Sequence, residues 1–77
     1  MDLEYIAEQT KTNGIFRINN VEWLALMNTS LRGNYPLQQL ETWAKDQKIT
    51  FNVEYSERNE RYSIVSAVTF LRSHQAK

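Results

Sequence analysis

The chain has 77 residues and no cysteine, and nine basic side chains balance nine acidic ones. This length suits a single domain over residues 1–77 with a modest core, and the lack of cysteine excludes disulfides and cysteine metal sites. No segment resembles a signal peptide or a membrane span, so we expect a cytoplasmic protein without membrane contact. Because the net charge is zero, no global field steers the chain toward nucleic acid, and an electrostatic site has to be local.

The first segment, DLEYIAEQTKTNG, has the apolar spacing of a short helix, with Asp2 placed as an N-cap and Gly14 as a stop signal. A helix over residues 2–12 is the preferred prediction. The rival is a hairpin, because apolar and polar residues also alternate here and Asn13 followed by Gly14 is a strong turn dipeptide. Residues 15–18 are rich in β-branched and aromatic side chains, which predicts a short strand.

Two helices are predicted next. The stretch NNVEWLALMNTS offers an asparagine cap and an apolar stripe that runs almost all round, which predicts a short, well-buried helix. SLRGNYP marks a connection, and Pro36 suits the first turn of the following helix. We expect both Trp23 and Trp43 to pack in the core rather than to stack on a ligand. The inward face of the second helix carries Leu37, Leu40, Trp43 and Ala44.

Residues 49–56 alternate between apolar and polar, which is the period of a strand with one buried face. Tyr62 and Ile64 begin a partner strand, and the polar SERNE between the two predicts an exposed loop. Ser63 is placed as the N-cap of a last helix, because the apolar residues after it are spaced at i, i+3, i+4 and i+7. This predicted C-terminal helix has Ile64, Ala67, Val68 and Leu71 on its apolar face.

The predicted order of helix, short strand, two helices, strand, charged loop, strand and helix resembles a winged helix-turn-helix domain. Residues 20–48 would be the two-helix unit, and residues 49–65 would be the hairpin called the wing. The second half, PLQQLETWAKDQKITFNVEYSERNERYSIVSAVTFLRS, is similar in pattern to the small excisionase and MerR-type DNA-binding modules. The fold class that the resemblance implies is α+β, a small winged helix-turn-helix fold.

The resemblance implies two groups of contacts to double-stranded DNA. In the major groove, glutamine can pair with adenine, and lysine with guanine or phosphate. Arginines of the turn and wing would reach phosphates or the minor groove. The recognition helix would contribute Gln38, Gln39, Thr42 and Lys45. The turn and wing would contribute Arg32, Arg58, Asn59 and Arg61.

Catalytic chemistry is not indicated by the sequence. His74 is the only histidine, and without cysteines or clustered carboxylates it makes no metal site. The hairpin carboxylates Glu54, Glu57 and Glu60 lack the burial that a catalytic acid and base pair needs. No phosphate-binding glycine loop occurs. We therefore expect no enzyme, no metal and no cofactor.

The leading hypothesis is a DNA-binding transcription regulator or recombination accessory factor of the phage or mobile-element type. A single small module reads few base pairs, so it is expected to act as a homodimer or beside a second protein on DNA. The alternative is a winged-helix protein-binding module or inhibitor that does not bind DNA. Zero net charge suits it, as does the presence of Glu41 and Asp46 on the recognition helix. A self-assembling structural subunit is a third possibility.

Overall fold

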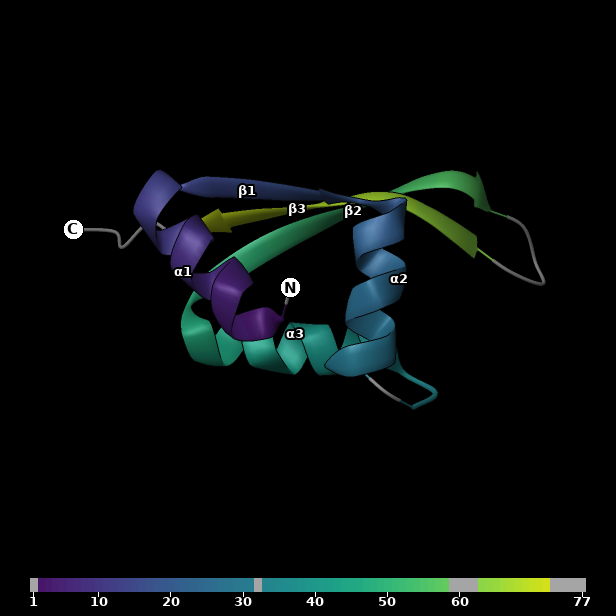
Figure 1. Cartoon of the computed structure of the whole chain (residues 1–77), viewed down its shortest axis with the longest axis horizontal. Coiled ribbons are helices and arrows are strands. Elements are labelled where there is room, and N and C mark those ends of the chain that lie inside the picture. The colour runs from purple at the N-terminus through teal and green to yellow at the C-terminus, as the bar shows by residue number, and fades with distance from the viewer. Residues whose placement is uncertain (1, 32, 59–62, 73–77) are drawn as a thin grey trace.

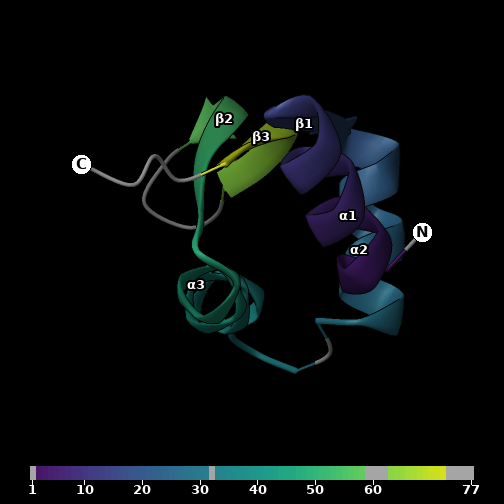
Figure 2. The same cartoon turned by 90° about the vertical axis from the view of Figure 1, so that its left-hand side faces the viewer.

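The computed structural model describes residues 2–31, 33–58 and 63–72, which form three helices and three strands. In chain order the elements are α1 (Leu3–Asn13), β1 (Ile15–Asn19), α2 (Asn20–Thr29), α3 (Pro36–Gln47), β2 (Ile49–Arg58) and β3 (Ser63–Arg72). The strands make one antiparallel sheet in the order β1-β3-β2, and the helices lie on one face of it (Figure 1, Figure 2). The predicted α+β class is confirmed. None of the helices in these ranges is long and apolar enough to cross a membrane.

The first segment is a helix, as preferred, and the hairpin alternative is wrong. The side chain of Asp2 accepts a hydrogen bond from the backbone N–H of Tyr5 at 2.9 Å, which caps the start of α1. Gly14 adopts a left-handed φ of 84° and its N–H bonds to the carbonyl of Thr10, which ends the helix. Because Gly14 reverses the chain at once, β1 begins at the next residue.

The predicted C-terminal helix is wrong, because the residues from Ser63 onward form the strand β3. β3 is central, with β1 on one side and β2 on the other. The helices bury the inner face of β3, while its outer face carries small or apolar side chains such as Ala67 and Leu71, so the sequence lacks polar alternation and helical spacing appears by coincidence. The β-branched Val65, Val68 and Thr69 are the signal that favours a strand here.

The core lies between the inner face of the sheet and the helices. Strand register aligns side chains across the sheet in two rows, and Val68 and Phe70 of β3 are the fully buried centres of these rows. The rows are Phe16, Phe70 and Phe51, and Ile18, Val68 and Val53. Each helix covers the rows with a fully buried side chain, namely Ile6, Leu26 and Leu40. Trp43, as predicted, packs inward, with its ring edge-to-face on Phe70 at 6.1 Å.

The expectation of a well-buried α2 is only partly met. Trp23 and Leu26 are buried, but Leu24 is 49% exposed and Val21 is 69% exposed. The physical reason is that the small sheet covers α2 from one side only (Figure 2). Part of the apolar surface that runs round α2 is therefore exposed to solvent.

A buried hydroxyl gives a first test of the packing. Thr10 is fully buried, and its Oγ1 has no hydrogen-bond partner among the described residues. Thr10→Val replaces this hydroxyl with a methyl of similar shape, so the free energy of unfolding should rise by about 1 kcal/mol in urea denaturation. Thr10→Ser is the control, because it keeps the hydroxyl, loses the methyl and should be less stable than the wild type. A loss of stability in Thr10→Val would show that the hydroxyl is bonded in solution.

The end of α3 gives a second test. Lys48 has a φ of 60° and is the only non-glycine residue with positive φ in the described ranges. Because a side chain disfavours this conformation, Lys48→Gly should raise the free energy of unfolding by about 0.5–1 kcal/mol. Gly14→Ala is the matched reverse change, because it adds a side chain at a positive φ, and it should lower the free energy of unfolding by about 1 kcal/mol. An unchanged thermal midpoint for Lys48→Gly would contradict the assignment of strain to this residue.

Candidate functional site

The exposed side of α3 is the largest polar surface that the prediction singled out. The helix begins at Pro36, and buried Leu40 and Ala44 fix which side faces the core. Its opposite side is polar and carries one cationic and two carboxylate side chains. The exposed residues are Gln38, Gln39, Glu41, Thr42, Lys45 and Asp46.

Three of the four predicted residues of this helix lie together. Gln38, Thr42 and Lys45 follow at i, i+4 and i+7 on one exposed side. The hydroxyl of Thr42 donates to the backbone carbonyl of Gln38 at 3.2 Å, so the Thr42 side chain is held against the helix. Gln39 is different. Its Nε2 lies 3.3 Å from where a Cβ on Gly33 would be, which places its side chain over the turn before α3.

The other four predicted residues belong to the turn and the hairpin. Arg58 ends β2, and its side chain lies outside the described residues, as do Arg32, Asn59 and Arg61. The hairpin itself is well defined on either side of this gap. β1 pairs only with residues 67–71 of β3, so the far part of β2 and β3 projects past β1 (Figure 1).

An apolar groove, which the sequence interpretation missed, lies between α2, the start of α3 and the base of the projecting hairpin. It has a volume of about 370 Å³. Among the described residues, no charged side chain lines it. Its lining residues are Asn20, Trp23, Leu24, Met27, Pro36, Leu37, Tyr55, Ile64 and Val65. The signal that could have indicated it is the all-round apolar sequence of α2, which leaves more apolar surface than one small core can cover.

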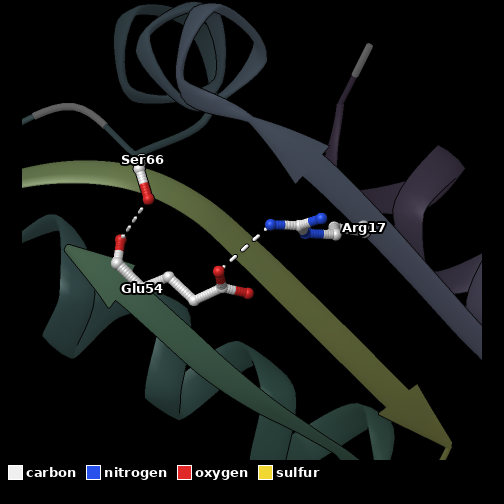
Figure 3. A network of polar contacts seen from close by, with 3 residues as sticks. All are labelled: Arg17, Glu54 and Ser66. Carbon is white, nitrogen blue, oxygen red and sulfur yellow. Dashed lines mark hydrogen bonds and ion pairs between the residues drawn. The ribbon is translucent and has the colours of Figure 1, made fainter. Parts of the chain in front are cut away.

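The outer face of the sheet carries an ion pair that spans three strands. Nη2 of Arg17 on β1 lies 3.1 Å from Oε1 of Glu54 on β2, across the small side chains of β3 (Figure 3). Ser66 of β3 donates to the backbone carbonyl of Glu54 at 3.2 Å. Both charged side chains are more than half exposed, so the pair contributes little to stability.

The side of α1 that approaches α3 is acidic. Asp2, Glu4 and Glu8 line a hollow of about 670 Å³ together with Trp43 and Gln47. Lys11 is the one cation there, and its Nζ donates to Oε1 of Gln47 at 3.1 Å. A polyanion would be repelled from this end of α3.

Comparison with known proteins gives no match of any of the three kinds sought. No protein-family model matches the chain, no curated protein matches it, and no solved structure matches its fold. Among the described residues, no group of three or more histidine, cysteine or acidic side chains is placed to hold a metal ion. The site is therefore interpreted from the placement of its own residues.

Proposed function

We propose that this protein is a small winged helix-turn-helix DNA-binding protein, a transcription regulator or recombination accessory factor of the phage or mobile-element type. In this proposal α2 and α3 are the two-helix unit, and the hairpin of β2 and β3 is the wing. The observation that carries it is a helix with a polar outer side, α3, that leads directly into a hairpin projecting beyond the body of the domain (Figure 1).

The order of elements supports the proposal at the level of topology. Helix, strand, two helices and two strands follow one another, with β1 added beside β3. The closing helix implied by the narrower likeness to excisionase and MerR-type modules is replaced by strand β3. The proposal therefore rests on the two-helix unit and the hairpin, which this replacement leaves in place.

The proposed contacts follow from hydrogen-bonding chemistry. With α3 in the major groove, Gln38 would pair with adenine and Lys45 with guanine or phosphate, while Thr42 would contact either a base or the backbone. The side chain of Gln39 lies over the turn before α3, so it would contact DNA phosphates rather than bases. Arg32, Arg58, Asn59 and Arg61 complete the proposal as contacts of the turn and wing.

The proposed interface has few cations, so binding should be weak and strongly dependent on salt. About four phosphate contacts would reduce affinity about 100-fold between ~50 and ~200 mM salt. The acidic side of α1 repels phosphate and should weaken binding further.

A charge-matched pair of variants tests the proposal. Lys45→Gln should weaken binding to a mixed-sequence duplex severalfold at ~50 mM salt and lower the slope of log affinity against log salt by about 1. Arg17→Gln removes the same charge from the outer face of the sheet, away from α3, and should leave affinity and slope unchanged. Fluorescence anisotropy with a labelled duplex measures both.

Two outcomes would contradict DNA binding by α3. One is an anisotropy that does not change with protein even at ~50 mM salt, where the phosphate contribution is largest. The other is an equal loss of affinity in Lys45→Gln and Arg17→Gln, which would show a response to net charge alone. Thermal midpoints of both variants close to the wild type are required for either interpretation.

A second candidate function is a protein-binding module of the same fold that does not bind DNA. The observation in its favour is the charge on α3, where Glu41 and Asp46 outnumber Lys45 on the exposed side. Such a mixed surface suits a protein partner better than a phosphate backbone. The anisotropy experiment separates the two candidates, because this one predicts no binding at any salt concentration.

A further inference from the structure

The α2 patch is an apolar surface that the proposed function does not use. It consists of the apolar groove together with Val21 and Ala25 on the outer side of α2 and Tyr35 just before α3. Val21 and Tyr35 are 69% and 68% exposed, and Leu24 and Ile64 at the rim are 49% and 41% exposed. Such a concentration of exposed apolar side chains beside a groove is typical of a protein interface.

We propose that the α2 patch is the contact between two copies of this chain, arranged about a two-fold axis. In such a contact the same patch serves on both copies, so it must contain a projection and a hollow that fit each other. The α2 patch has both. Leu24 and Val21 project from one side of α2, and the groove lies beside them between α2 and the hairpin.

Charge favours this face over the other described faces for contact between identical copies. The α1 side carries Asp2, Glu4 and Glu8, which would oppose the same carboxylates on a second copy. The outer face of the sheet carries the ion pair of Arg17 and Glu54. The described lining of the groove contains no charged residue, and a chain with zero net charge has no overall repulsion from its copy.

Glu22 also belongs to α2, but its carboxylate does not bring a charge into the α2 patch. Its carboxylate accepts a hydrogen bond from the backbone N–H of Asn19 at 2.9 Å, in a capping box at the start of the helix. Asn19 in turn accepts from the N–H of Glu22, so the carboxylate is held at the helix end. The side of α2 that carries Leu24 is left without charge.

The area indicates how strong the contact is. A standard interface uses 20–30 residues and about 800 Å² on each partner, which is roughly 30–40 Å² per residue. The nine groove residues together with Val21, Ala25 and Tyr35 then supply about 400 Å² per copy. The total of about 800 Å² is below the standard interface size, so the dimer should be weak and transient.

The inference goes beyond the proposed function and stands without it, because it is tested in the absence of DNA. Sedimentation equilibrium of the wild-type chain should show a mass that rises from 9.1 kDa toward twice that value as concentration increases through the micromolar range. Leu24→Lys and Val21→Lys should each weaken dimerisation at least tenfold. Both positions are substantially exposed, so both variants should keep the circular dichroism spectrum and thermal midpoint of the wild-type monomer.

Ile15→Lys is the matched control. Ile15 is 53% exposed, but it lies on β1 and is not among the residues that line the groove, so the dimer should persist in this variant. A wild-type chain that stays at 9.1 kDa up to about 1 mM would overturn the proposal. A dimer that Leu24→Lys and Val21→Lys leave intact would overturn it equally, because the copies would then meet elsewhere.

The absence of cysteine from the chain allows a second, geometric test. Residues close to a two-fold axis meet their own counterparts, and a disulfide forms only when the two Cα atoms come within about 7 Å. Single-cysteine variants Val21→Cys and Ala25→Cys flank Leu24, and at least one should cross-link under mild oxidation much faster than Ile15→Cys. Equal rates for the three variants would reject the two-fold contact through α2.

Discussion

The sheet depends on one strand, β3, which lies between β1 and β2 and pairs with both. Val68 and Phe70 of β3 are the centres of the two side-chain rows that the helices cover. The end of the same strand also holds α1. The backbone N–H of Arg72 donates to the carbonyl of Gly14, and its guanidinium donates to the carbonyl of Lys11 in the last turn of α1. One strand therefore positions every layer of the domain.

Local signals predicted most of the elements, because each was set by residues close in sequence. Asp2 and Gly14 delimit α1, Asn19 caps α2, and Pro36 begins α3, where the sequence indicated. The start of β3 was predicted as a strand, but the rest of it was predicted as a helix. Its outer face carries Ala67 and Leu71 rather than charged residues, so polar alternation is weak, and Ile64, Ala67, Val68 and Leu71 fit a helical spacing as well.

The candidate site was predictable only in part. The polar side of α3 follows from helical spacing, so Gln38, Thr42 and Lys45 come together as expected. The orientation of Gln39 depends on the turn packed beneath it, which no spacing rule describes. The groove is formed by residues of α2, α3 and the hairpin that are far apart in the chain, so only the folded arrangement reveals it. The domain thus has a polar side on α3 and an apolar side on α2, two surfaces suited to different contacts.

The central place of β3 also has a consequence for how the chain folds during synthesis. β1 and β2 do not pair with each other, so no part of this sheet can form until β3, the last of the three in the sequence, has left the ribosome. Until then the rings of Phe16, Trp43 and Phe51 have no Phe70 to pack on. Folding of the sheet is therefore expected to be cooperative, and a nascent chain that stalls before β3 presents exposed aromatic residues to chaperones.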